Sequence, residues 1–165
     1  MLHSLIRGLE NIVDIPDTDA HCDIPCKIYD PSSSQIAALS VARIMDIIKE
    51  TSESDKSDVE IQNTIARCVV RKEEEAEKVK HEVRIIWGDY CKAPQKEAFP
   101  EIDDLVHGIM LKGSACKQGV SKKDAEDLVD MVNRFAEIFW ATKDIKTKRQ
   151  TCPYPPSLET VYPVL

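Results

Sequence analysis

One short stretch, residues 21–31, gathers the side chains best suited to bind a transition metal. It reads HCDIPCKIYDP and places His21 beside Cys22, with Cys26 four residues further on. Thiolate and imidazole are the ligands that soft or borderline transition metals prefer. Pro25 excludes a regular helix and favours extended geometry for the residue before it. The loop can therefore curl until both thiols face one point.

Taken by themselves, these residues leave three interpretations open. The loop could be a metal site, Cys22 and Cys26 could form a disulfide or redox pair, or the residues could have no chemical role. Zinc would be the default metal, but it usually takes four side-chain ligands in a tetrahedron. The loop offers three, and Asp23 would have to fold back to become the fourth.

The wider pattern, His-Cys-Asp-x-Pro-Cys-x-x-Tyr-Asp-Pro, resembles the nickel hook of nickel-dependent superoxide dismutases. The resemblance implies that His21 begins the mature enzyme and that one nickel ion is bound per subunit. Its ligands would be the α-amine of His21, the deprotonated amide and thiolate of Cys22, and the thiolate of Cys26. The imidazole of His21 would be an axial ligand in the oxidised state. The implied reaction converts superoxide to dioxygen and hydrogen peroxide as nickel alternates between its divalent and trivalent states.

The same resemblance implies roles for residues around the loop. Tyr29 matches a tyrosine that screens the metal from larger ligands, and Asp23 matches an acid that holds the loop geometry. Lys92 and Lys117 match lysines near the active-site entrance, and Tyr90 would meet the hook. These residues are the candidates for catalysis, substrate steering and hook docking.

Two further segments carry the resemblance. Residues 87–94 match a Trp-x-Asp-Tyr-x-Lys-x-Pro pattern, and residues 138–143 match the end of the family's last helix, so the likeness spans about 21–143. One position departs from the family: Ala37 stands where a glutamate supports the axial imidazole. Another group must then tune the histidine.

Residues 1–20 resemble the propeptide that this family removes on maturation. They lack the continuous apolar core of a secretory signal. While Ala20 remains attached, the nitrogen of His21 is an amide and a poor metal ligand. We therefore expect the full-length chain to be an inactive precursor that needs a maturation protease.

Hydrophobic periodicity predicts an all-α fold, an antiparallel up-down four-helix bundle over residues 21–145. Capping boxes at Ser57 and Ser121 open the second and fourth helices. Lys72 falls on the apolar stripe of the second helix and is expected to reach out of it to solvent. The predicted helices cover residues 32–50, 57–88, 100–119 and 121–143.

The resemblance also implies a homohexamer. The sequence itself offers only a second apolar stripe on the first helix, formed by Ile36, Leu39 and Ile47, which another subunit could cover. Residues 146–165 are proline-rich and lack a helical period, so we expect them to be disordered or to lie along the surface.

Composition excludes some classes of function. The net charge of −7 argues against general binding to nucleic acid or anionic membranes, and no apolar run approaches the ~18 residues of a membrane span. Nothing in the cysteine spacing indicates an extracellular disulfide framework. Thiols destined for nickel need a reducing compartment, which predicts the cytoplasm or an organelle stroma.

Two rival functions remain at this stage. A non-catalytic nickel or zinc carrier using the same hook would take up metal in an uncleaved chain without redox cycling. A thiol redox protein, with a reversible bond between Cys22 and Cys26, would be active without metal and indifferent to the loss of His21.

Overall fold

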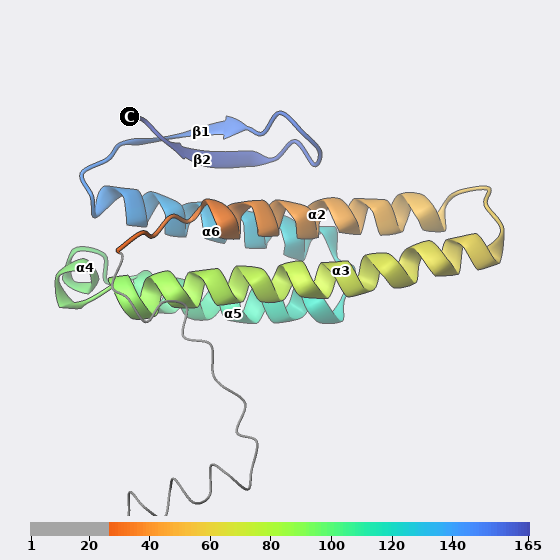
Figure 1. The fold of residues 1–165 in the computed structure, drawn as a ribbon, viewed down its shortest axis with the longest axis horizontal. Coiled ribbons are helices and arrows are strands. Elements are labelled where there is room, and N and C mark those ends of the chain that lie inside the picture. Colours follow the sequence, from red (N-terminus) through yellow and green to blue (C-terminus); the bar gives the residue numbers. More distant parts are fainter. Residues whose placement is uncertain (1–26) are drawn as a thin grey trace, which may run out of the picture.

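The computed structural model describes residues 27–165. The predicted propeptide and the hook residues His21, Cys22, Asp23 and Cys26 lie outside this part. Within it, consecutive long helices run up and down beside one another and pack as a ring, in the order α2, α3, α5, α6, which confirms the predicted helical bundle (Figure 1). The helices are α2 (Ser32–Ser52), α3 (Asp58–Ile85), α5 (Ile102–Gln118) and α6 (Lys122–Ala141).

Local capping chemistry determines where these helices begin and end. The Glu60 carboxylate accepts hydrogen bonds from the backbone nitrogen (3.1 Å) and hydroxyl (2.6 Å) of Ser57, so α3 begins at the predicted capping box. The hydroxyl of Ser121 accepts from the backbone nitrogen of Asp124 at 3.2 Å and opens α6. Gly119 ends α5, as its position in the sequence predicts.

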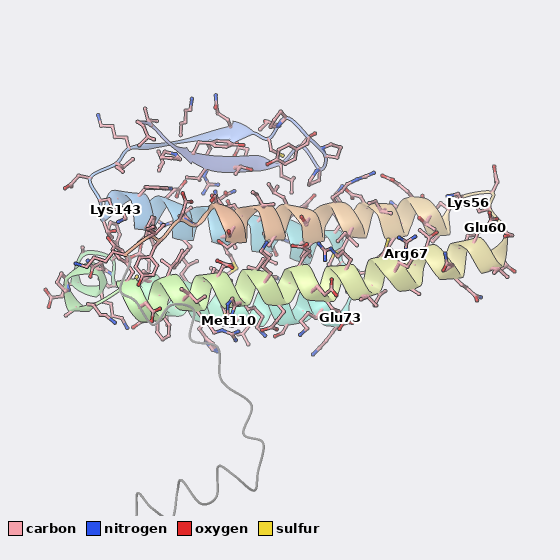
Figure 2. The ribbon with its side chains drawn as sticks, viewed as in Figure 1. Lys56, Glu60, Arg67, Glu73, Met110 and Lys143 are labelled. Atoms are coloured by element: carbon pink, nitrogen blue, oxygen red, sulfur yellow. The ribbon has the colours of Figure 1, made fainter. Side chains whose placement is uncertain are left out.

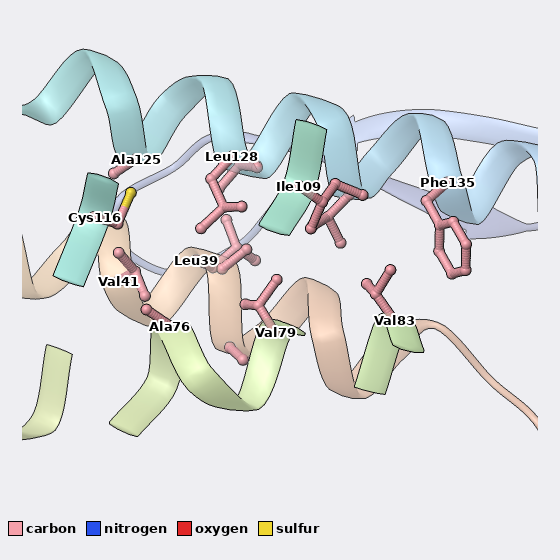
Figure 3. Close-up of a cluster of buried hydrophobic side chains, with 14 of the residues drawn as sticks. Leu39, Val41, Ala76, Val79, Val83, Ile109, Cys116, Ala125, Leu128 and Phe135 are labelled. Carbon is pink, nitrogen blue, oxygen red and sulfur yellow. The ribbon is translucent and has the colours of Figure 1, made fainter. Parts of the chain in front are cut away.

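The core lies between the four helices and is built from the predicted apolar stripes (Figure 3). Burying one such aliphatic or aromatic side chain stabilises the fold by roughly 1.5–3 kcal/mol. Cys116 belongs to this core, and burial raises the pKa of its thiol to about 11, so it behaves as a small apolar residue. Figure 3 labels Leu39, Val41, Ala76, Val79, Val83, Ile109, Cys116, Ala125, Leu128 and Phe135.

Lys72 does not reach out to solvent, so that prediction is wrong. Its side chain is only 2% exposed. The ammonium donates to the carbonyls of Cys116 (2.6 Å), Lys117 (2.9 Å) and Gly119 (2.6 Å), at the end of α5. Carbonyls at a helix C-terminus have no partner within the helix, and a cation there also complements the helix dipole. Burial lowers the pKa of this ammonium, because desolvation penalises the charged form, while the nearby carboxylate of Glu73 opposes the shift.

Of the two expectations for residues 146–165, disorder is wrong, and these residues instead lie along the surface of the bundle. They form an antiparallel hairpin of β1 (Thr147–Thr151) and β2 (Glu159–Pro163), paired from Thr147↔Pro163 to Thr151↔Glu159. The hairpin lies along α6 and forms a third layer over the bundle (Figure 1). Val161 and Cys152 are 1% and 2% exposed, so this segment adds to the core. Its contacts with α6 and with Gln35 of α2 form only on folding, which is why the local pattern does not reveal it.

Part of the second apolar stripe on α2 faces this hairpin. Ile36 and Leu39 line the same groove as Tyr154 and Pro155 of the hairpin turn. Leu39 is 3% exposed, whereas Ile36 stays 55% exposed. The chain itself therefore covers part of the face that the sequence left available to a neighbour.

The sequence predicts that the second helix ends near residue 88 and is followed by a loop, but the connection between α3 and α5 contains two short helical segments. A π-helical turn, η1 (Ile86–Tyr90), continues α3 and closes with a 3.3 Å bond from the Cys91 nitrogen to the Ile86 carbonyl. The short helix α4 (Ala93–Ala98) follows. None of the helices described between residues 27 and 165 combines the length and apolar character needed to cross a membrane.

Replacing Lys72 should destabilise the bundle. Lys72→Met keeps the apolar stem but removes three bonds to the end of α5, so we expect unfolding free energy to fall by about 2 kcal/mol. Denaturant unfolding measures this. Lys78→Met, at an exposed position of the same helix, is the matched control and should change little. Equal stability of the two variants would contradict the capping role of Lys72.

Candidate metal centre and its surroundings

The described chain begins at Lys27, inside the predicted metal-binding loop of residues 21–31 and directly after its last predicted ligand, so the exit from that loop can be followed. Lys27 has a φ of 58°, a left-handed conformation that turns the backbone directly after Cys26. Asp30 accepts a 2.8 Å bond from the backbone nitrogen of Ser32, and the buried Ser34 hydroxyl donates to the carbonyl of Pro31 at 2.7 Å. These bonds tie the end of the loop to the first turn of α2.

Tyr29 and Tyr90, two of the predicted site residues, are brought together. Their ring centroids lie 5.9 Å apart with planes tilted by 47°. Tyr90 in turn packs against Phe139 at 5.2 Å, and Phe139 contacts Trp140 at 5.1 Å. Tilted pairs at these spacings suit the quadrupoles of aromatic rings. We call Tyr29, Tyr90, Phe139 and Trp140 the aromatic cluster.

The hydroxyl of Tyr90 fixes the cluster to the end of α6. It lies 2.7 Å from the hydroxyl oxygen of Thr142. Thr142 donates its own hydrogen to the carbonyl of Phe139, also at 2.7 Å. Since a hydroxyl has one hydrogen to give, Tyr90 is the donor to Thr142. The ring of Tyr90 is therefore held both by packing and by a directed bond.

Lys143 is a functional candidate that the sequence analysis did not single out. Its ammonium lies 4.8 Å from the ring centre of Tyr90 and 5.1 Å from that of Phe139, which is cation–π distance. The residue is exposed and lies where α6 ends (Figure 2). The signal available in the sequence was its place as the last residue of the 138–143 segment. That segment indicated the end of a helix but not which ring the lysine would contact.

The two predicted steering lysines lie in different places. Lys92 is exposed two residues after Tyr90, and its ammonium donates to the carbonyl of Gly88 at 2.8 Å. Lys117 is in the last turn of α5 and pairs with Glu77 of α3 at 3.2 Å. Thirteen residues of helix separate Glu77 from Tyr90, a distance of about 20 Å. A single chain therefore does not bring Lys117 to the aromatic cluster.

Trp87, also part of the matched segment, makes a structural contact. Its indole nitrogen donates to Asp103 at 2.7 Å, and Lys96 both pairs with Asp103 at 2.9 Å and lies 5.0 Å from the Trp87 ring centre. The hydrogen bond from Lys96, followed by that from Trp87, lowers the pKa of the Asp103 carboxyl. These contacts join η1, α4 and the start of α5, which positions the segment that carries Tyr90.

The described residues do not themselves assemble a metal site. Between residues 27 and 165, no group of three or more His, Cys, Asp or Glu side chains is arranged to hold an ion. Cys91 lies next to Tyr90, but burial raises the pKa of its thiol, which disfavours a thiolate ligand. Ala37 is fully buried and offers no polar group to an imidazole. The predicted donors therefore remain His21, Cys22 and Cys26, outside the described part.

Comparison with known proteins points to one family. The sequence model of the family "Nickel-containing superoxide dismutase" matches residues 16–143. The enzymes named superoxide dismutase [Ni] from Streptomyces seoulensis and Streptomyces coelicolor are each 35% identical over 124 residues, which is 75% of this chain and 88% of theirs.

Solved structures agree with the sequence comparisons. A native nickel superoxide dismutase structure has a TM-score of 0.65 at 33% identity, covering 74% of this chain and 99% of that one. A structure whose nickel ligation corresponds to the oxidised state has a TM-score of 0.66 at 33% identity, with 75% and 99% covered. The family match ends before β1, so the hairpin lies outside it.

The Tyr90–Thr142 bond should appear as a coupling energy. In a double-mutant cycle with Tyr90→Phe and Thr142→Val, we expect the two changes to couple by about 1 kcal/mol in unfolding free energy. Denaturant unfolding of the four proteins measures it. Additive effects of the two substitutions would mean that the hydroxyl contact does not hold the tyrosine ring.

Proposed function

This chain belongs to the nickel-containing superoxide dismutase family, and from that premise we propose how its own residues serve the reaction. The enzyme is an oxidoreductase that converts superoxide to dioxygen and hydrogen peroxide, with nickel as its cofactor. The family match favours this function over a non-catalytic metal carrier. The remaining question is which residues bind the nickel, which screen it from larger ligands and which steer superoxide towards it.

His21, Cys22 and Cys26 are the nickel ligands in this proposal. Two thiols and an imidazole form a donor set that fits a borderline transition metal. The α-amine of His21 and the amide of Cys22 complete the set once Ala20 has been removed. Bound nickel would supply the one-electron couple that dismutation requires. Asp23, next to Cys22, would hold the geometry of the loop.

Tyr29 is proposed to screen the metal, and its contact with Tyr90 is the single observation that carries this part of the proposal. Tyr29 follows Cys26 by three residues, so its ring must stay near the loop. Tyr90 packs against that ring at 5.9 Å and is itself held by Thr142 at 2.7 Å. A tyrosine held in this way can exclude larger ligands while its hydroxyl hydrogen-bonds a small anion or water.

Local positive charge would attract the anionic substrate. The full-length chain has a net charge of −7 and stays acidic after removal of residues 1–20, so attraction of superoxide must come from cations near the entrance. Lys143, over the ring of Tyr90, and Lys92, two residues after it, are the described cations suited to this role. Lys117 could act at an entrance only across a subunit boundary, which fits a hexameric assembly.

Maturation, assembly and location complete the proposal. A protease would remove residues 1–20 and leave the mature chain to assemble as a hexamer. The described cysteines are all unpaired: Cys68, Cys91, Cys116 and Cys152. Free thiols are usual in a reducing compartment, which supports the cytoplasm or an organelle stroma as the place of action.

Superoxide consumption by two nickel-loaded chains tests the amine ligand. One chain begins at His21 and the other keeps Ala20 in front of it. We expect fast turnover only in the first, because an amide nitrogen in place of the amine is a poor donor. Pulse radiolysis measures the rate, and metal analysis checks the nickel content.

The other outcomes of that comparison are also informative. Equal turnover by both chains would show that the amine is dispensable and would overturn this ligand set. If neither chain consumes superoxide although nickel is bound and the bundle is folded, the non-catalytic metal carrier becomes the favoured function. His21→Ala in the first chain should abolish fast turnover without unfolding the protein.

Lys143→Met tests electrostatic steering. We expect kcat/KM to fall about threefold at low ionic strength and the difference to shrink as salt is added, because screening weakens long-range attraction. Lys78→Met, an exposed lysine in the middle of α3, is the control and should leave kcat/KM unchanged. A loss that is the same at every salt concentration would point to altered packing rather than steering.

A further inference from the structure

The C-terminal hairpin lies outside the family match, yet it is hydrogen-bonded to α2, the helix that follows the proposed metal-binding loop. The side-chain nitrogen of Gln35, in the first turn of α2, donates to the carbonyl of Val161 in β2 at 2.9 Å. The same nitrogen donates to the side-chain oxygen of Asn133 in α6 at 3.1 Å. Three elements far apart in the sequence therefore meet at one buried amide.

Asn133 closes this network from the other side. Its side-chain oxygen also accepts from the backbone nitrogen of Val161 at 3.1 Å, and its nitrogen donates to the carbonyl of Glu159 at 2.8 Å. Gln35, Asn133 and Val161 are 5%, 2% and 1% exposed. Buried amides that lose one partner leave the other unsatisfied, so such a network resists partial opening.

The network reaches the end of the loop within one helical turn. The carbonyl of Pro31 accepts from the backbone nitrogen of Gln35 at 3.1 Å and from the hydroxyl of Ser34 at 2.7 Å. Pro31 is the last residue of the hook, two residues after Tyr29. A restraint on the side chain of Gln35 is therefore a restraint on the point where the loop joins the bundle.

A separate contact docks the hairpin without touching α2. Arg149 of β1 bonds Glu137 at 2.7 Å and Asp130 at 2.5 Å, both on α6. The hairpin thus has its own attachment to α6, and Gln35 is what connects it to the first turn of α2. Removing the Gln35 bonds should leave the hairpin docked.

We propose that the hairpin, residues 147–163, is a clamp that acts through Gln35 to position the metal-binding loop. Gln35 is a positioning residue: it contacts neither metal nor substrate. The inference rests on the proposed nickel ligands in that loop. A loop anchored to a fixed turn holds its thiols in one arrangement, so the metal leaves more slowly.

Gln35→Met tests the clamp in the chain that begins at His21 and retains the hairpin. Methionine fills similar volume but cannot donate to Val161 or Asn133. We expect nickel loss to a chelator to become about tenfold faster, the effect of about one buried hydrogen bond. Hydrogen exchange of residues 32–35 should also accelerate about tenfold in the metal-free protein, a readout that needs no activity.

Ile48→Ala is the matched control. It removes buried apolar atoms from the same helix, about 20 Å from Gln35, and lowers overall stability without touching the clamp. It should leave nickel loss and exchange at residues 32–35 close to wild type under native conditions. If it accelerated both as much as Gln35→Met does, general destabilisation would explain the effect and the clamp would be wrong.

The remaining outcomes separate this inference from the proposed ligand set. Wild-type nickel retention and exchange in Gln35→Met would overturn the clamp while leaving the ligands intact. Nickel retention that survives His21→Ala and the double change Cys22→Ser with Cys26→Ser would overturn the ligand set. That result would also overturn the clamp, because the loop it positions would then not hold the metal. This conclusion would stand whatever rate of hydrogen exchange residues 32–35 show.

Discussion

The packing of Tyr29 against Tyr90 is the constraint on which the functional end of this protein depends. It joins the end of the proposed metal-binding loop to the connection that follows α3. Tyr90 also packs on Phe139 and donates to Thr142, so the same ring links that end to α6. Any displacement of these helices relative to one another would move the tyrosine that faces the loop.

The buried polar groups follow a common principle. Lys72, Gln35 and Asn133 are all nearly inaccessible to water, and each binds backbone groups of a different element: the end of α5 for Lys72 and strand β2 for the two amides. A buried donor without a partner costs about 1–3 kcal/mol, so these residues favour one arrangement of helices over others of similar apolar packing. The apolar core supplies most of the stability, and these buried hydrogen bonds determine how the helices are arranged.

The distribution of thiols keeps the metal chemistry apart from the core. Burial raises the pKa of Cys91 and Cys116, so both remain protonated and are poor ligands or nucleophiles. The proposed nickel thiols, Cys22 and Cys26, lie on either side of Pro25 in the sequence, a residue type that disfavours helix. On the proposed ligand set, the thiols that bind nickel are separate from the buried thiols on which the bundle packs.

Local patterns in the sequence determined the helices, because capping boxes at Ser57 and Ser121 and apolar repeats act over one or two turns. They also carried the family resemblance, which rests on contiguous motifs such as residues 21–31. The same patterns could not reveal that Lys72 caps α5, that Lys143 lies over Tyr90, or that residues 147–163 form a hairpin. In each case the deciding partner is brought close only by folding: the end of α5 lies 44–47 residues from Lys72, and Val161 lies 126 residues from Gln35. Tertiary structure alone decided these contacts, since a side chain satisfies whichever groups packing brings within reach.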